Sequence, residues 1–195
     1  MAYDRLKLLL KDELGYLPRA GLDELFSRGE VNRLSRGDVV IAEGVKCPDV
    51  YIIQDGIVRF VDMNGDKERT FGFGLPGTIF SSKHSFAMDL PSYYRAEACC
   101  DTVLMHIKKE DFWEVVPKYH ELTIWMLRYA YGELFYHEYR NAVVHKGSAV
   151  ERYRSMACDR PEIIRKVPQK IIASYLGVTP EYLSKLKNIY LKSRN

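Results

Sequence analysis

The sequence of 195 residues lacks any apolar run near the roughly 20 residues that a membrane-spanning helix needs. Its first residues, MAYDRLKLLLKDELG, are charged and amphipathic, so they lack the apolar core of a secretion signal. No repeat or low-complexity stretch stands out, and 47% hydrophobic with 28% charged residues is an ordinary globular composition. We therefore expect a cytoplasmic protein of one or two domains.

Cysteine is scarce, and the four cysteines, at positions 47, 99, 100 and 158, have no zinc or iron–sulfur spacing. Disulfide frameworks are typical of shorter secreted chains, so we interpret the four as reduced thiols. Cys99 and Cys100 are expected to point to opposite faces of a strand, and a redox role for them stays open. The five histidines are scattered, and no nucleophile lies at a recognisable spacing from a base. We expect no metal site and no catalytic residues.

Acidic residues are almost absent from the end of the chain. Residues 165–195 carry seven Lys or Arg and a single acid, Glu181, although the net charge of the whole chain is only +3. A basic terminus on a near-neutral body is typical of proteins that contact the phosphates of nucleic acid.

Two short amphipathic runs in this terminus flank Gly177-Val178-Thr179. Their apolar residues share one helical face in each run: Ile172, Ala173 and Leu176, then Leu183, Leu186 and Tyr190. Gly177 can take the left-handed conformation that ends the first helix, and Thr179 can cap the second ahead of Pro180. So tight a turn makes the helices cross steeply, which requires a small residue such as Ala173. The pattern predicts a helix-turn-helix, with an ordinary helical hairpin as the alternative.

Residues 30–107 have the texture of short β-strands. The β-rich runs are VNRL, DVVIAEG, DVYIIQDG, IVRFVDMNGD, KERTFGFG, TIF and TVLMHI, separated by Arg-Gly-Asp, Asp-Gly, Asn-Gly and Pro-Gly turns. About seven such strands predict a small antiparallel sandwich or barrel. Short helices are expected at residues 2–16, 22–27 and 111–116.

A long helix is expected from Pro117 to about Val144, and it is apolar on two faces. Three- and four-residue steps alternate along the first stripe: Leu122, Trp125, Tyr129, Gly132, Tyr136, Tyr139 and Val143. The second stripe is Ile124, Leu127, Tyr131, Leu134 and Phe135. We interpret the first stripe as the seam of a homodimer and the second as the face that covers the β-domain; a single broad core face is the alternative.

A hinge is predicted at Lys146-Gly147-Ser148. Ser148 and Glu151 have the spacing of a capping box, which predicts a helix from Ala149 to about Asp159. The resulting α+β chain divides into a sensor domain at 1–116, a dimerisation helix at 117–146 and a helix-turn-helix domain at 147–195.

This order of elements resembles the CRP/FNR family of bacterial transcription regulators over essentially the whole chain. The segments that carry the resemblance are LSRGDVVIAEG, DVYIIQDGIVRF, LPGTIF and IIASYLGVTPEYLSKLKN. The resemblance implies a jelly-roll-like β-roll of the cyclic-nucleotide-binding type that senses a small molecule. It also implies a homodimer whose recognition helices enter successive major grooves of double-stranded DNA, with RNA polymerase as a partner.

Two departures from the family bear on the effector. Ser81-Ser82 stands where its cyclic-nucleotide binders carry Gly-Glu, and Pro91-Ser92 where they carry Arg-Ser, so a buried cyclic phosphate would lack a guanidinium. Arg95 lies three residues after Ser92, and in a strand this odd offset would aim it at the opposite face. We therefore do not expect cyclic AMP, and the effector stays unidentified. The expected pocket residues are Phe80, Ser81, Ser82, Lys83, Ser92, Tyr93 and Tyr94.

The resemblance also assigns the DNA contacts. At 100° per residue, the face opposite Leu183 and Leu186 carries Glu181, Ser184, Lys185, Asn188 and Lys192. Glu181 and Lys185 match the family's base-reading positions. The phosphate contacts are assigned to Thr179, Pro180, Gln169 and Lys170. Few residues follow Leu191, so the family's wing has no room, and Lys192 and Arg194 are expected to replace part of it.

Two other functions stay open. A metal-dependent cupin enzyme would need clustered strand ligands, and of the histidines only His106 lies in a predicted strand. A protein-binding adaptor would keep the fold without contacting DNA. For the regulator, we expect an effector to change the packing of Trp125, Tyr129, Tyr136 and Tyr139 across the dimer seam.

Overall fold

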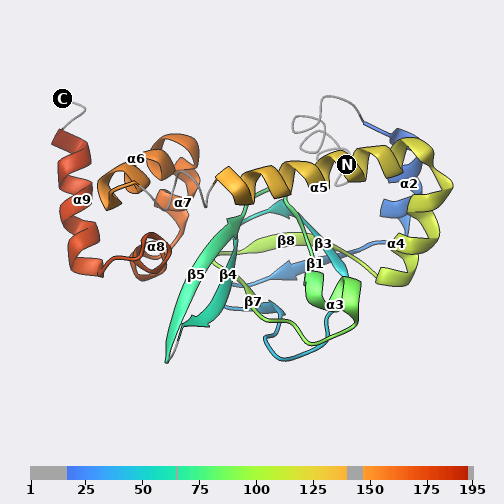
Figure 1. Cartoon of the computed structure of the whole chain (residues 1–195), viewed down its shortest axis with the longest axis horizontal. Coiled ribbons are helices and arrows are strands. Elements are labelled where there is room, and N and C mark those ends of the chain that lie inside the picture. Colours follow the sequence, from blue (N-terminus) through green and yellow to red (C-terminus); the bar gives the residue numbers. More distant parts are fainter. Residues whose placement is uncertain (1–16, 65, 140–146, 193–195) are drawn as a thin grey trace.

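The computed structural model describes residues 17–64, 66–139 and 147–192. Two antiparallel sheets form a β-roll, the long helix α5 (His120–Tyr139) runs along it, and four helices gather at one end (Figure 1). The predicted α+β fold is confirmed, and the helix predicted at residues 2–16 lies outside the described residues. Within the described ranges, no helix has the length and apolar character to cross a membrane.

Each sheet has four strands, in the orders β1-β8-β3-β6 and β2-β7-β4-β5. In chain order the strands are β1 (Glu30–Leu34), β2 (Val39–Ile41), β3 (Val50–Asp55), β4 (Val58–Asn64), β5 (Lys67–Gly74), β6 (Ile79–Phe80), β7 (Arg95–Ala98) and β8 (Thr102–Ile107). Strand β7 is the addition to the predicted set. Its sequence, RAEA, lacks the β-branched and aromatic residues by which strands are recognised. Its alanines are buried while Arg95 and Glu97 point outwards.

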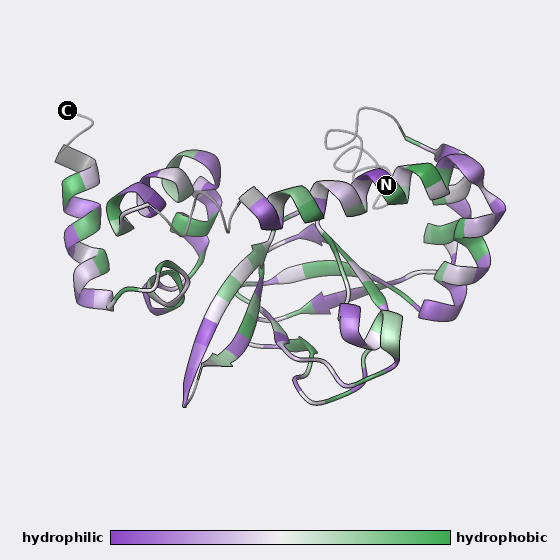
Figure 2. Cartoon of the chain, in the orientation of Figure 1, coloured by the Kyte–Doolittle hydropathy of each residue, from purple (hydrophilic) through white to green (hydrophobic). Residues whose placement is uncertain are grey.

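Glycine turns set the register of the sheets. Gly56, between β3 and β4, has φ +90°, and a Cβ there would lie 2.6 Å from the carbonyl oxygen of Asp101. Only glycine therefore fits this turn. Asn64 pairs with Lys67, which leaves two residues for the β4–β5 turn and confirms the hairpin predicted from Asn-Gly. Hydrophilic residues gather at the tip of this hairpin (Figure 2).

The helices around the roll are α2 (Arg19–Ser27), α3 (Lys83–Met88), α4 (Lys109–Val115) and a 3-10 turn, η1 (Val116–Lys118). Pro117 lies inside η1, so α5 begins at His120 rather than at the proline. One apolar cluster fills the space between the two sheets and includes Ile53 and Leu104. A second lies between the first sheet and the helices and includes Leu25, Ile52 and Met105.

Helix α5 corrects the assignment of its two apolar stripes. Leu122 and Trp125, predicted for a dimer seam, have no exposed surface and belong to the cluster beneath α5. The hydroxyl of Tyr129 accepts from the N–H of Ile79 at 2.8 Å and donates to its carbonyl at 3.0 Å. The start of the first stripe therefore covers the chain's own β-roll, because Leu122 and Trp125 pack in one cluster with Ile52 and Met105 of the first sheet.

The second stripe, predicted to cover the β-domain, faces outwards instead. Leu127, Leu134, Tyr131 and Phe135 are all more than half exposed, Tyr131 at 66% and Phe135 at 69%. Gly132 lines a cavity, described below. Tyr136 and Tyr139 lie on α5 but their side chains are outside the described part, and Val143 lies outside the described residues.

The C-terminal helices are α6 (Ala149–Asp159), α7 (Pro161–Lys166), α8 (Gln169–Leu176) and α9 (Pro180–Lys192). The capping box of α6 is confirmed, since Ser148 accepts from the Glu151 N–H while the Glu151 carboxylate accepts from the Ser148 N–H. Helix α7 was not among the predicted helices. One apolar cluster joins these helices to the β-roll through Phe73, Ile57 and Cys99.

Candidate nucleic-acid interface and effector cavity

The turn between α8 and α9 has the geometry that the sequence predicts. Gly177 is left-handed, with φ 66°. The N–H of Val178 donates to the carbonyl of Ala173 at 3.0 Å, which closes the end of α8. The Thr179 hydroxyl accepts from the N–H of Tyr182 at 3.2 Å and so caps α9. The predicted helix-turn-helix is confirmed as a structural unit.

A buried side holds α9 in place. Leu183 and Leu186 are almost completely buried in a cluster with Ile172, Ala173 and Leu176 of α8. Tyr190 packs edge-to-face on Tyr153 of α6, with ring centres 5.6 Å apart. Because α9 is anchored along one side, its opposite side is presented at a defined angle.

The opposite side is open. The exposed residues among those predicted to contact DNA are Gln169, Lys170, Thr179, Pro180, Glu181, Ser184, Lys185 and Asn188. Lys192 is on α9, with its side chain outside the described part. Tyr182 and Ile189 are also exposed, at 44% and 47%, and they share a face with Lys185 through i, i+3, i+7 spacing. The sequence reasoning missed these two, and that spacing is the signal that could have found them.

Two polar side chains on this face already make local hydrogen bonds. A hydrogen bond from its own backbone N–H and one from the Thr179 hydroxyl lower the pKa of Glu181, which keeps it ionised. The Ser184 hydroxyl donates to the carbonyl of Pro180 at 3.2 Å, within the same helix. Lys185 and Asn188 make no such local bond among the described residues, so their donors can reach a partner.

A cavity of about 460 Å³ lies between the β-roll, α5 and the C-terminal helices. All the predicted pocket residues except Ser92 line it, namely Phe80, Ser81, Ser82, Lys83, Tyr93 and Tyr94. Sequence reasoning missed a second group of lining residues, which includes Phe60, Phe71, Phe73, Tyr129, Gly132, Glu133, His137 and Arg160. They come from strands and helices far apart in the chain, so no local motif marks them.

Ser92 was placed wrongly in the pocket. It is 2% exposed, and its hydroxyl donates to the carbonyl of Tyr94 at 2.8 Å. Its backbone N–H donates to Val45 and its carbonyl accepts from Gly44, so it holds one loop against another. These bonds keep Ser92 inside the loop rather than at the cavity wall.

Most hydroxyls at the cavity wall are committed to the protein itself. The Tyr94 hydroxyl donates to the carbonyl of Ser81 at 2.8 Å. The Tyr129 hydroxyl accepts from the N–H of Ile79 and donates to the Ile79 carbonyl. Ser82 is fully buried and caps α3 by accepting from the N–H of Ser85. The hydroxyls of Tyr94 and Tyr129 are therefore not available to a ligand, whereas Ser81 and Tyr93 also line the wall.

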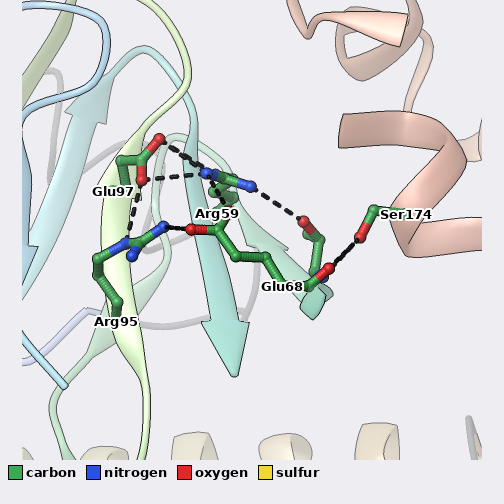
Figure 3. Close-up of polar contacts among 6 residues, drawn as sticks. Arg59, Glu68, Arg95, Glu97 and Ser174 are labelled. Atoms are coloured by element: carbon green, nitrogen blue, oxygen red, sulfur yellow. Dashed lines mark hydrogen bonds and ion pairs between the residues drawn. The ribbon is translucent and has the colours of Figure 1, made fainter. Parts of the chain in front are cut away.

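Arg95 points away from the cavity, as the strand offset predicts. It donates to Glu68 and Glu97, which also bind Arg59, so that two guanidiniums and two carboxylates form one network (Figure 3). The hydrogen bond from Arg95 is the largest cause of the lowered pKa of Glu68. Neither arginine lines the cavity.

The network lies next to the contact between β5 and α8. The Ser174 hydroxyl of α8 accepts from the N–H of Thr70 at 3.0 Å and donates to the carbonyl of Glu68 at 3.3 Å. Nearby, Tyr175 packs on Phe73 with ring centres 5.1 Å apart. The first helix of the helix-turn-helix therefore docks on the β-roll of its own chain.

The cysteines and histidines offer little chemistry. Cys99 and Cys100 follow the end of β7 in a bend, which corrects their placement on a strand. Burial raises the pKa of Cys99 to about 12, so its thiol stays protonated. His106 lies on β8 and contacts Asp49 at 2.7 Å. Among the described residues, no three His, Cys, Asp or Glu side chains are grouped to hold a metal ion.

Comparison with known proteins finds a family model that matches the β-roll. Residues 31–119 match the model of the cyclic nucleotide-binding domain. The matched segment runs from β1 to the 3-10 turn η1, so it covers the β-roll and the helices α3 and α4. A search of curated proteins finds no match to the sequence.

Solved structures extend the likeness beyond the cyclic nucleotide-binding domain. FixK2 from Bradyrhizobium japonicum is 21% identical, with a TM-score of 0.69 over 85% of each chain. The Catabolite Activator Protein of Thermus thermophilus is 17% identical, with a TM-score of 0.55 over 90% of this chain and 84% of that one. The sensor domain of the transcriptional regulator DNR from Pseudomonas aeruginosa is 20% identical, with a TM-score of 0.53 over 69% of this chain and 95% of that one. The chain thus has the CRP-like fold, with a β-roll of two antiparallel sheets joined to further helices.

Proposed function

We propose that the chain is a cytoplasmic transcription regulator of the CRP/FNR type that binds double-stranded DNA as a homodimer. The observation that carries this proposal is the anchored, capped α9, whose open side holds Glu181, Lys185 and Asn188 beside a basic terminus. The likeness to the Catabolite Activator Protein and to a transcriptional regulator's sensor domain supports it.

The open side of α9 suits the edges of bases in a major groove. The ionised carboxylate of Glu181 can accept a hydrogen bond from cytosine N4, and Lys185 can donate to guanine O6 or N7. Phosphates would bind Gln169 and Lys170 of α8 and the N–H groups at the start of α9, next to Thr179. Tyr182 and Ile189 add apolar surface on the same side, suited to a thymine methyl group.

A second copy of the chain is proposed to pack on the outer face of α5. Leu127, Tyr131, Leu134 and Phe135 expose a continuous apolar stripe along that face. One helix pair makes few DNA contacts, so two copies are needed for tight binding. Each copy would occupy one half-site, about 34 Å from the other.

The cavity is proposed to hold a small effector other than cyclic AMP. The β-roll supplies no arginine to it, because Arg59 and Arg95 are held in the ion-pair network. A cyclic phosphate would therefore lack the guanidinium partner from the roll that its charge requires.

DNA binding is tested by selecting sites from a random double-stranded pool and measuring affinity by fluorescence anisotropy at several salt concentrations. Lys185→Gln is expected to weaken binding to the selected site by about 1–3 kcal/mol and to relax specificity at one position. The matched control is Lys108→Gln, which removes the same charge from an exposed position before α4. No selected site and no salt-dependent binding to double-stranded DNA would favour the protein-binding adaptor. Equal affinities for Lys185→Gln and Lys108→Gln would contradict the proposed role of Lys185.

The dimer is tested by sedimentation equilibrium. Leu134→Glu is expected to give a folded monomer with reduced DNA affinity, because it buries a charge in the proposed interface. Val45→Glu places the same charge on an exposed apolar position of a loop and is expected to leave the assembly unchanged. A Leu134→Glu protein that stays dimeric would place the interface elsewhere.

A further inference from the structure

The cavity combines flat aromatic walls with cationic side chains. The rings of Phe60, Phe71 and Tyr94 pack against one another, with centres 5.5 to 6.1 Å apart. Phe80 packs edge-on against Phe60 at 5.4 Å. The volume of about 460 Å³ falls within the range of roughly 300–1,000 Å³ that small-molecule sites occupy. Walls of this kind favour a planar apolar ring.

The charged groups at the cavity favour an anion. Two cations, Lys83 and Arg160, and one acid, Glu133, line it together with the rings of His84 and His137. Lys83 is exposed and has no ion-pair partner among the described residues. His84 Nδ1 lies 2.7 Å from the carbonyl of Pro91, and because a carbonyl only accepts, that nitrogen carries the hydrogen.

Arg160 differs from the other lining residues in its origin. It stands between α6 and α7, in the part of the chain that carries the helix-turn-helix. Its N–H donates to Met156 at 3.0 Å and its carbonyl accepts from Ile163 at 3.1 Å, so the corner that bears it is held from both sides. A guanidinium has five N–H donors and can therefore serve a ligand together with a protein partner.

Several hydroxyls at the cavity wall are already used within the protein. The hydroxyls of Tyr94 and Tyr129 are bonded to the backbone, and Ser82 caps a helix. The aromatic wall therefore offers a ligand ring contacts, and the charged side chains supply the strong polar contacts. The ligand that fits has one flat ring system and a single compact anionic group.

From these observations we propose that the cavity binds a small planar aromatic carboxylate. Its ring lies against the Phe60, Phe71 and Tyr94 wall, and its carboxylate is held by Lys83 of the β-roll and Arg160 of the C-terminal helices. The inference rests on the proposed function, in which this cavity is the effector site. The bound carboxylate links the two halves of the chain through two charge-assisted hydrogen bonds.

The first test measures binding to the full-length protein by titration calorimetry. The probes are 1-naphthoate, indole-3-carboxylate and phenylacetate, each beside its primary amide, together with cyclic AMP. At least one acid is expected to bind at least about tenfold more tightly than its amide, since a hydrogen bond to a charged group contributes about 1.5–3 kcal/mol. Equal binding of acids and amides, tighter binding of cyclic AMP, or no binding of any carboxylate at millimolar concentration would each overturn the proposal.

Variants then locate the carboxylate. Arg160→Gln and Lys83→Gln are each expected to weaken the acid about tenfold and to leave the amide unchanged. Phe71→Leu should weaken the acid and the amide together, because both lose the ring contact. Arg154→Gln, an exposed arginine of α6 outside the cavity, is the matched control. If Arg160→Gln left the affinity for the carboxylate unchanged, the proposed link between the β-roll and the C-terminal helices would be contradicted.

A reciprocal measurement separates this inference from the proposed function. A saturating concentration of the aromatic carboxylate is expected to change the affinity of the protein for the selected DNA. The selected DNA should change the affinity for the carboxylate by the same factor, because the coupling is mutual. DNA binding without acid binding would overturn the ligand class and leave the regulator intact. Binding of the carboxylate without DNA binding would overturn the proposed regulator and leave the ligand class intact.

Discussion

The β-roll meets two other parts of the chain in different ways. Beneath α5 the contact is apolar and fully closed, with Leu122 and Trp125 at 0% exposure. At α8 it includes polar groups at its edge, where Ser174 bonds to the backbone of β5 beside four charged side chains. Opening the first contact would expose Leu122 and Trp125, which are completely buried. Opening the second would expose Ile57, Phe73 and Cys99, while its hydrogen bonds can be exchanged for bonds to water. We infer that α5 moves with the roll and that the helix-turn-helix can separate from it.

The largest expected effect tests the closed contact. Trp125→Ala should destabilise the protein by about 3–5 kcal/mol in urea unfolding, because it leaves a cavity beneath α5. Trp113→Ala removes the same side chain where it is 53% exposed, and it should have a much smaller effect. Similar losses for the two variants would remove the distinction between the inner face of α5 and the surface.

Arg59→Gln tests the charged network, with an expected loss of about 2 kcal/mol. The side chain of Arg59 is 10% exposed, and its removal leaves Glu97, at 16%, without its closest guanidinium. Arg69→Gln, on the same hairpin, breaks an ion pair with Asp62 whose arginine is 55% exposed, and it should be nearly neutral. The comparison weakens if both variants are equally stable by urea unfolding.

Ser174→Ala should have a smaller effect on unfolding, about 1 kcal/mol or less, and a clear one on docking. The N–H of Thr70 and the carbonyl of Glu68 would turn to water, so the C-terminal helices should separate from the roll more often. Small-angle scattering would detect the larger dimensions. Ser155→Ala, whose hydroxyl bonds to Asp159 within α6, is the control and should leave the dimensions unchanged.

Lowering the pH should slightly weaken the contact between β5 and α8. The hydrogen bond from Arg95 lowers the pKa of Glu68 in the folded chain, so its stabilisation is present above its unfolded pKa and is lost as the pH falls through the folded pKa. Glu68 is 45% exposed, so screening limits the effect to below about 1 kcal/mol. Urea unfolding from about pH 6 to about pH 3.5 should show a shallower decline for Glu68→Gln than for the unchanged chain. Parallel declines would contradict this role.

Local patterns were enough to predict much of the fold. The glycine and threonine around the α8–α9 turn, the capping box at Ser148 and the Asn-Gly hairpin depend on bonds between near neighbours in the chain. Strand β7, which the offset of Arg95 assumed, was not among the β-rich runs because its alanines are strand-forming only through burial between two other strands.

The sequence by itself determined which residues of α5 and α9 are apolar, where the chain turns, and that the C-terminal end is basic. Only the tertiary structure decided which apolar stripe of α5 is buried. Both stripes have helical spacing and aromatic residues, and the choice depends on the contacts of Leu122 and Trp125 with residues far away in the chain, such as Ile52 and Met105. Tertiary structure alone also brought Arg160 to the wall of a cavity built mainly by the β-roll. Helical periodicity is a property of neighbours, whereas a cavity wall is made where distant segments meet.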